Sequence, residues 1–253
     1  MDKRIGAQYY TIRDFCQTLD DFEKSCEKVS KIGYKTVQLS AIGDFDPNDI
    51  KTILDKNNLK AVCTHRPADN YLNNIEKEIE FHKIIGCDVA GLGAMPYGEA
   101  TSGSVKRFIE EFSPVAERLG SEGLTFAYHN HCWEFMKEDG RFIMDMMLGG
   151  FKSDNLKLIL DVYWLAYAGI NPAKFIRAYG DRLACIHFKD LKIDWHKQKF
   201  AEIGYGNLDW DEIIAACDDS EAKYALVEQD VCDDNPFVCL ERSYKFLSQK
   251  GFE

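Results

Sequence analysis

Several features that would point to a membrane, nucleic-acid or secreted protein are missing from this sequence of 253 residues. It has no apolar run near the roughly 20 residues that a membrane-spanning helix needs. It also has no basic excess: the net charge is −11, and a nucleic-acid partner would require a basic face. The N-terminus leads straight into a strand-like run, without the apolar region of a signal peptide.

The nine cysteines lack the pattern of a disulfide or zinc-binding set. Their number is odd, and no CxxC pair occurs among them. Cys63, Cys87 and Cys185 lie within apolar, strand-like runs, where a free thiol packs as a small hydrophobic side chain. Together with the N-terminus, this predicts a protein of the reducing cytoplasm.

Low-complexity segments and linkers rich in proline or glycine are also missing, so residues 1–253 predict one domain. The chain alternates strand-like runs with amphipathic stretches whose apolar residues recur every three or four positions. The eight predicted strands are 5–10, 36–39, 60–64, 89–92, 125–129, 156–160, 183–188 and 224–227. The predicted helices are 20–32, 46–57, 73–85, 104–122, 139–148, 172–179, 210–218 and 236–249.

This alternation predicts an α/β protein with a closed (β/α)8 barrel, the TIM barrel, because eight βα units in about 250 residues match its length. A doubly wound open sheet is the alternative, and in that fold a glycine-rich phosphate loop often follows the first strand. Here the first predicted strand is followed by Thr-Ile-Arg-Asp at residues 11–14, which contains no glycine. The barrel is therefore favoured.

Three predicted strands end in residues that bind divalent metals. Asp161 follows Leu-Ile-Leu, His187 follows Ala-Cys-Ile, and Glu228 follows Ala-Leu-Val. In a barrel, the ends of strands six, seven and eight are neighbours on one rim, so these side chains can converge on one ion. Taken singly, each has a simpler interpretation: a helix cap for Asp161, a hydrogen-bonded core residue for His187 and a salt bridge for Glu228.

A mixed carboxylate and imidazole set suits Mn²⁺, Mg²⁺, Co²⁺ or Zn²⁺, and the lack of thiolates argues against structural zinc. The fourth ligand is expected from predicted strand five and its loop, where His129, His131 and Glu134 are the candidates. His129 stands at the strand end, and His131 has the same side-chain parity. The alternative is that this cluster binds substrate hydroxyls or only structures the loop.

Five segments in order along the chain carry a family resemblance. They are Gln-Tyr-Tyr-Thr-Ile-Arg-Asp (8–14), Tyr-His-Asn-His-Cys-Trp-Glu-Phe (128–135), Leu-Asp-Val-Tyr-Trp (160–164), His-Phe-Lys-Asp (187–190) and Gly-Tyr-Gly-Asn-Leu-Asp-Trp (204–210). These segments resemble motifs of the sugar phosphate isomerase/epimerase superfamily, also called the xylose isomerase-like TIM barrels.

This resemblance implies a divalent metal held at the ends of strands five to eight, with Asp161, His187 and Glu228 in the last three places. In the first place, where many members have a Glu, this chain carries His129. Inosose dehydratases of the superfamily also have a His-rich end of strand five, so a His at this place does not exclude chemistry.

Other candidates occupy the same rim. The resemblance places His65, at the end of predicted strand three, near the reacting carbons; the alternative is a strand-end hydrogen bond. Lys189 shares a face with His187 and is expected to hold a substrate oxygen or to pair with Asp161 or Glu228. The candidate substrate contacts are Gln8, Tyr10, Gln38, His131, Trp133 and Trp164.

The leading hypothesis is a metal-dependent isomerase or epimerase that acts on a sugar, keto-sugar or sugar phosphate through an enediolate. Glu134 and Glu228, with His65 as an alternative, are the candidate bases. A lyase on the same scaffold, acting by inosose dehydration or keto-glycoside elimination, is one alternative. A non-catalytic sugar-binding subunit is another, because the strand-five Glu is missing. Apolar surface helices would allow a homo-oligomer.

Overall fold

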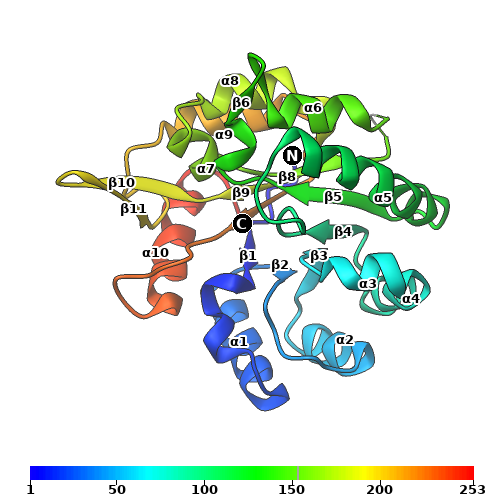
Figure 1. Ribbon diagram of the computed structural model, residues 1–253. Helices are drawn as coiled ribbons and strands as arrows, with labels where there is room; N and C mark the ends of the chain where they lie inside the picture. The colour runs from blue at the N-terminus through cyan, green and yellow to red at the C-terminus, as the bar shows by residue number, and fades with distance from the viewer. Residues whose placement is uncertain (153) are drawn as a thin grey trace.

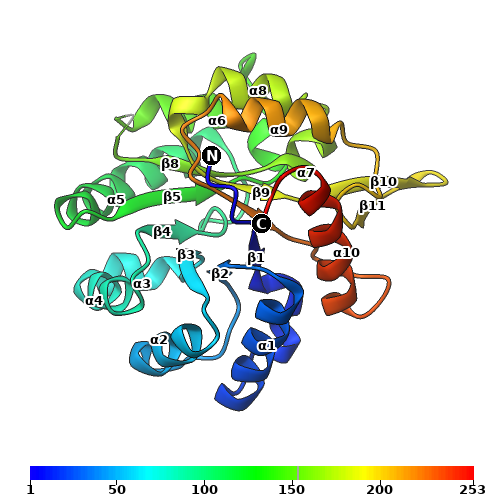
Figure 2. The ribbon, with the colours of Figure 1, turned by 180° about the vertical axis from the view of Figure 1, so that it is seen from behind.

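The computed structural model describes residues 1–152 and 154–253 as a barrel of eight parallel strands surrounded by helices (Figure 1). The hydrogen-bonded order of the strands is β3-β2-β1-β12-β9-β8-β5-β4, which is nearly closed. The view from behind shows helices around the outside of the strands (Figure 2). The barrel strands are β1 (Gly6–Gln8), β2 (Thr36–Leu39), β3 (Lys60–Thr64), β4 (Val89–Leu92), β5 (Thr125–His129), β8 (Lys157–Asp161), β9 (Leu183–Phe188) and β12 (Tyr224–Val227).

The predicted barrel is thus confirmed, and most predicted strands have the observed bounds. The first strand is shorter than predicted and ends at Gln8, because the Gln8 side chain accepts a hydrogen bond from the Tyr10 backbone and begins a 3-10 helix, η1 (Tyr9–Phe15). The sixth strand extends one residue further than predicted, to Asp161.

Helices connect successive strands and cover the outside of the barrel. They are α1 (Leu19–Ile32), α2 (Pro47–Lys56), α3 (Ala68–Asn73), α4 (Ile75–Ile85), α5 (Ser102–Ser121), α6 (Ile143–Gly150), α7 (Val162–Tyr167), α8 (Pro172–Ala178), α9 (Trp210–Asp218) and α10 (Pro236–Gln249). None of the helices among the described residues is long and apolar enough to cross a membrane.

Two predicted helices differ from the structure. The predicted helix 73–85 begins only at Ile75, and a separate short helix, α3, precedes it. The predicted helix 139–148 begins at Ile143, because Asp139 and Gly140 have positive φ and form the turn between strands β6 (Lys137–Glu138) and β7 (Arg141–Phe142).

One hairpin that the sequence did not predict extends away from the barrel. Strand β10 (Asp190–Asp194) pairs antiparallel with β11 (Lys197–Ala201) and begins one residue after Lys189. Figure 1 shows the hairpin in yellow, projecting beyond the helices. Trp195 is at its tip and is 86% exposed.

The core lies between the strands and the surrounding helices. Helix α1 buries Phe22 and Val29 in this layer, and helix α5 buries Phe108 and Phe112. Full burial of a side chain of this size contributes roughly 1.5–3 kcal/mol, so this layer is the main source of stability. The nine cysteines are free thiols.

Strands β3 and β4 stand at the two ends of the hydrogen-bonded order and meet through a few specific contacts. The Gly91 carbonyl accepts hydrogen bonds from the Arg66 backbone and from the Tyr71 hydroxyl, each at 3.0 Å. A Cβ atom at Gly91 would lie 2.1 Å from the Thr64 carbonyl oxygen, so no other residue fits without a backbone shift. This seam therefore depends on a close approach of two backbones.

Candidate active site

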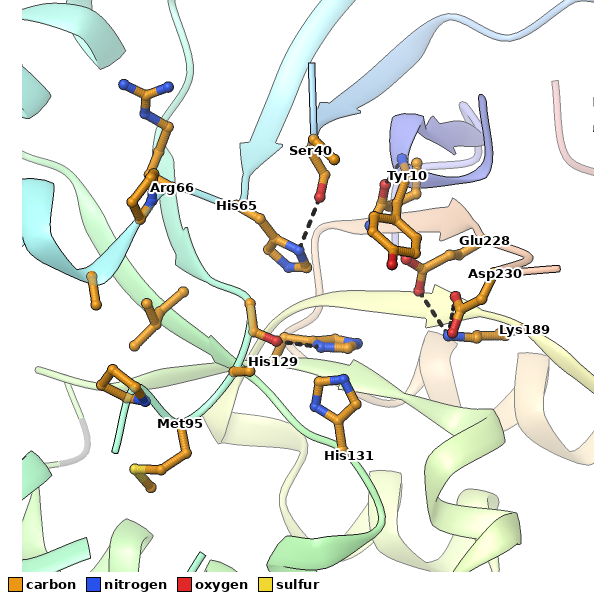
Figure 3. A pocket seen from close by; sticks show the side chains of 18 residues that line it. Tyr10, Ser40, His65, Arg66, Met95, His129, His131, Lys189, Glu228 and Asp230 are labelled. Carbon is orange, nitrogen blue, oxygen red and sulfur yellow. Dashed lines mark hydrogen bonds and ion pairs between the residues drawn. The ribbon is translucent and has the colours of Figure 1, made fainter. Parts of the chain in front are cut away.

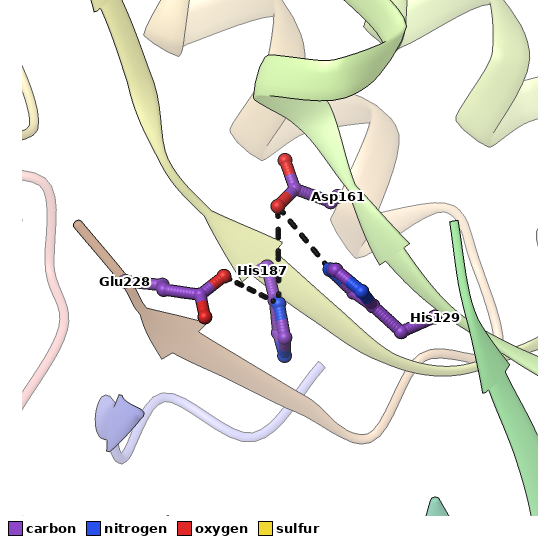
Figure 4. A group of neighbouring side chains, drawn as sticks. All are labelled: His129, Asp161, His187 and Glu228. Atoms are coloured by element: carbon purple, nitrogen blue, oxygen red, sulfur yellow. Dashed lines mark hydrogen bonds and ion pairs between the residues drawn. The ribbon is translucent and has the colours of Figure 1, made fainter. Parts of the chain in front are cut away.

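Four buried side chains converge at one end of the barrel. His129 ends β5, Asp161 ends β8, His187 lies in β9, and Glu228 directly follows β12. One ligand-type atom from each lies within 4.8 Å of those from the other three (Figure 4). The strand-end pattern thus brings together the four residues that the sequence predicted as metal ligands.

Each of the two histidines has one ring nitrogen fixed by an oxygen outside the cluster. His129 Nδ1 is 3.0 Å from the Gly93 carbonyl oxygen and can only donate to it. His187 Nε2 is 2.7 Å from Gln38 Oε1, which likewise accepts. A neutral imidazole that donates outward presents an unprotonated nitrogen inward, the arrangement typical of histidine metal ligands.

The inward nitrogens face carboxylate oxygens. His129 Nε2 is 3.3 Å from Asp161 Oδ2, and His187 Nδ1 is 3.0 Å from Glu228 Oε2. His187 Nδ1 is buried and makes no hydrogen bond of acceptable geometry. Burial alone would lower the pKa of His129, but Asp161 raises it, so a proton can hold that pair, whereas the buried His187 Nδ1 is left without a partner among the described residues. Two imidazoles and two carboxylates are a donor set that fits a divalent metal ion.

Lys189 is a second source of positive charge in the cluster. Its side chain is 1% exposed, and Nζ lies 3.3 Å from Asp161, 3.2 Å from Glu228 and 2.6 Å from Asp230. Burial alone would lower the pKa of Lys189, but the three carboxylates raise it above the usual range, so the ammonium stays charged. Three carboxylates around one ammonium leave two negative charges, which a divalent ion would balance.

Asp230 is the member of this group that the sequence analysis missed. It follows Glu228 by two residues, as Lys189 follows His187, and residues two apart in an extended chain point to the same side. This spacing could have predicted that Asp230 faces the cluster. Burial and the neighbouring Glu228 raise the pKa of Asp230 to about 6. Its carboxylate pairs with Lys189 Nζ, and the same ammonium donates a hydrogen bond to Glu228 Oε2 at 3.2 Å.

A cavity of about 510 Å³ opens over the cluster. In Figure 3, His65, His129 and His131 lie on one side, and Lys189, Glu228 and Asp230 lie on the other. Burial and the nearby His129 and His187 rings hold the pKa of His65 well below its usual range. Burial, with His129, lowers the pKa of His131 to about 2. Both imidazoles are therefore neutral at neutral pH.

The predicted substrate contacts on β1 and β2 lie close to the cluster, but their amides are engaged by the ligands. Gln8 Nε2 donates to Glu228 at 2.6 Å, and Gln38 is occupied by His187. Tyr10 lines the cavity, and its ring stacks on Arg13 at 4.2 Å. Gln8 and Gln38 thus hold Glu228 and His187, and both Gln8 and Tyr10 line the cavity.

The remaining candidates, Trp133 and Glu134 on the strand-five loop and Trp164 on α7, contact His131 or its loop and lie outside the cavity lining. Trp133 stacks on the His131 ring at 4.1 Å, and Trp164 is 5.4 Å from the same ring. The Glu134 carboxylate accepts hydrogen bonds from the Tyr128 hydroxyl at 2.5 Å and the His131 backbone at 2.8 Å. These three residues are outside the lining of the 510 Å³ cavity, whereas His65, His131 and Lys189 line it.

Asp190, the last residue of the motif 187–190, turns away from the cluster and organises the following loop. Its carboxylate accepts hydrogen bonds from the backbone of Gly204 at 2.9 Å and Gly206 at 3.1 Å, and from Trp210 Nε1 at 2.7 Å. It also accepts from the Leu191 backbone at 2.8 Å. The two motifs 187–190 and 204–210 are therefore one structural unit.

Comparison with known proteins agrees with the motifs. Residues 26–236 match the family described as xylose isomerase-like TIM barrel. An inosose dehydratase from Lacticaseibacillus casei is 23% identical over 267 residues, covering 89% of this chain and 88% of that protein. A sugar phosphate isomerase/epimerase structure from Parabacteroides distasonis ATCC 8503 has a TM-score of 0.78 at 22% identity, covering 97% of this chain and 93% of that one.

A structure of the IolI protein with a bound zinc atom has a TM-score of 0.73 at 12% identity and covers 99% of both chains. At such identities the solved structures establish the shared fold. The sequence match over 26–236, together with the four converging strand ends, gives the assignment. This chain belongs to the xylose isomerase-like TIM barrel family.

Proposed function

We propose that this protein is a metal-dependent lyase that removes an oxygen leaving group from the carbon β to the carbonyl of a keto-sugar or keto-cyclitol. One observation carries the proposal: the imidazoles of His65 and His131 face the buried Lys189 ammonium across the metal-type cluster. Elimination requires a base for a C–H proton and a donor for the departing oxygen, and these two walls supply them.

His129, Asp161, His187 and Glu228 would hold the metal ion. A bound divalent ion would polarise the substrate carbonyl and make the adjacent C–H more acidic. Asp161 also accepts hydrogen bonds from the backbone of Tyr163 and Trp164, so its carboxylate is held in place from the α7 side. The cluster is thus organised by contacts outside it.

His65 is the best-placed base. It lines the cavity, its ring is 5.1 Å from that of His129 and 5.6 Å from that of His187, and its Nε2 has no hydrogen-bond partner. Its lowered pKa leaves the imidazole free to accept a proton from carbon at neutral pH. Glu134, also a candidate from the sequence, is already engaged by Tyr128 and His131.

Lys189 is the donor for the leaving oxygen. Its ammonium pairs with Asp230, donates to Glu228, and lines the same cavity. In the elimination, the C–H electron pair forms the C=C bond, the C–O bond breaks, and the departing oxygen takes a proton from the Lys189 side. The inosose dehydratase relatives support this class of reaction.

A second candidate is the isomerase or epimerase reaction, which shares the first proton transfer. It is favoured by the several proton-accepting groups that surround the cavity, because an epimerase returns the proton to the opposite face of the same carbon. The two reactions differ only in whether an oxygen leaves.

Incubation with an inosose and Mn²⁺ in D₂O separates these possibilities. We expect loss of water, seen as a conjugated carbonyl, in the unchanged protein. His65→Asn should lose both deuterium exchange and dehydration, by about 10²–10⁴-fold. Lys189→Met should keep exchange and lose dehydration, and Lys192→Met, a half-buried lysine outside the cavity lining that pairs with Asp233, is the matched control.

Deuterium in an epimer or isomer without loss of water would replace the lyase by the second candidate. Absence of both exchange and Mn²⁺ binding would favour a non-catalytic sugar-binding role. Circular dichroism and Mn²⁺ binding on each variant show whether the fold and the metal site are retained.

A further inference from the structure

The cavity over the metal-type cluster adjoins another cavity at His65. It shares Ala41, His65, Arg66 and Pro67 with a connecting cavity of about 330 Å³. That one shares Asp44, Arg66, Asn70 and Phe81 with a further cavity of about 540 Å³, near the starts of α2 and α4. The connecting and further cavities together form a side groove. The connecting cavity and the further cavity each have the volume of a small-molecule site, for which about 300–1,000 Å³ is usual.

Arg66 is the fixed point of the side groove, because it lines all three cavities. Its Nε and Nη2 donate to the buried Glu78 carboxylate at 2.9 and 2.8 Å, and its guanidinium lies 4.2 Å from the Phe81 ring centre. Asn70 donates to the same carboxylate at 2.7 Å. The groove wall is therefore preorganised, and in Figure 3 the guanidinium points away from the imidazoles.

The lining of the further cavity matches a neutral, hydroxyl-rich ligand. Its charged residues are four carboxylates and two cations, and the Arg66 charge is already balanced by Glu78: Asp44, Asp46, Glu78, Glu80, Arg66 and Lys77. This surplus of carboxylates disfavours a phosphate. The amides of Asn48 and Asn74 and the apolar faces of Phe45 and Pro47 complete the lining.

We infer that the substrate is of disaccharide size, with the reacting ring at the metal-type cluster and an uncharged second sugar ring in the side groove. This inference rests on the proposed function. Because Lys189 faces the reacting ring from the wall opposite Arg66, the second ring is a substituent that binds and does not leave. The side groove thereby selects glycosylated substrates over free monosaccharides and sugar phosphates.

Binding of glucose, glucose 6-phosphate, cellobiose, maltose and trehalose to the full chain with Mn²⁺ tests this, measured as dissociation constants by ligand-observed NMR. We expect at least one disaccharide to bind about tenfold or more tightly than glucose, and glucose 6-phosphate to bind no better than glucose. Equal affinity for glucose and every disaccharide, or tightest binding of the phosphate, would overturn the inference.

Asn74→Trp fills the further cavity at an exposed position that makes no side-chain cap hydrogen bond. It should weaken disaccharide binding by about tenfold and leave the affinities for glucose and Mn²⁺ unchanged. Asn73→Trp is the matched control, because this exposed neighbour lies outside the cavity lining. Lys77→Trp, also exposed and in the lining, is an independent second variant.

The two proposals fail differently. If the side groove is not a sugar site, Asn74→Trp and Asn73→Trp behave alike while glucose and Mn²⁺ still bind. If the proposed function is wrong, the inosose assay with Mn²⁺ in D₂O shows neither deuterium exchange nor loss of water, and the inference falls with it.

Discussion

At the level of single residues, the hydrogen bond that each cluster histidine makes outside the cluster determines which ring nitrogen can bind a metal. His187 and His129 are oriented by Gln38 and by the Gly93 carbonyl, which fixes the tautomer that each presents to the carboxylates. Gln8 acts in the same way on Glu228. The sequence predicted the four cluster residues as metal ligands, but it predicted Gln8 and Gln38 as substrate contacts and did not indicate that they hold Glu228 and His187.

Gln38→Leu should weaken Mn²⁺ binding by about 10–100-fold, because His187 loses the acceptor that holds its ring. Isothermal titration of the purified variant with Mn²⁺ measures this without any substrate. Gln249→Leu, at the exposed end of α10, is the control and should bind Mn²⁺ like the unchanged protein. Equal affinity in both variants would mean that Gln38 does not position a ligand.

Among the elements, the β10–β11 hairpin and the loop after it depend on one buried carboxylate. Asp190 holds Gly204, Gly206 and Trp210 together, directly after Lys189 and two residues after the end of the strand that supplies His187. Any loosening of this unit would therefore reach the candidate active site.

Asp190→Asn should lower the free energy of unfolding by about 1–3 kcal/mol, because an amide nitrogen would replace one acceptor among buried N–H donors. Urea unfolding measures the change. Asp194→Asn, an exposed position in the same hairpin paired with Lys199, should change the stability by less than about 0.5 kcal/mol. Similar values for the two variants would contradict the role of Asp190.

Much of the barrel could be predicted from the sequence, because buried parallel strands such as Thr125–His129 and Leu183–Phe188 are short apolar runs with a polar residue at or next to their end. The hairpin could not, since Lys192, Asp194 and Lys199 give it the composition of a loop. The four ligand-type residues could also be predicted, because each lies at or next to the end of a strand. Glu134 turned inward to Tyr128, a contact six residues apart that periodicity does not encode.

Across the whole molecule, buried neutral histidines couple stability to pH. His82 is fully buried outside the active site, between the Thr64 hydroxyl at 2.9 Å and the Glu78 carbonyl at 2.7 Å. Burial lowers the pKa of His82 below its usual value. The unfolded chain therefore binds more protons than the folded protein as the pH falls below about 6.5, and acid favours unfolding.

The free energy of unfolding should consequently decrease between pH 7 and pH 5. His82→Gln removes one such group and should make this decrease less steep by up to about 1.4 kcal/mol per pH unit. Urea unfolding at closely spaced pH values measures both slopes. Above about pH 7.5, where the unfolded histidine is also neutral, the two proteins should show the same pH dependence, and parallel curves below pH 6.5 would contradict the assignment.

The seam between β3 and β4 has a consequence for where the barrel opens by local fluctuation. These two strands are joined by contacts to the Gly91 carbonyl, one of them from the Arg66 backbone, whereas the other neighbouring strands share ladders. Amide hydrogen exchange should therefore be fastest, within the sheet, along this line. Because Arg66 also forms the wall of the side groove, a ligand bound there would slow exchange at the seam first.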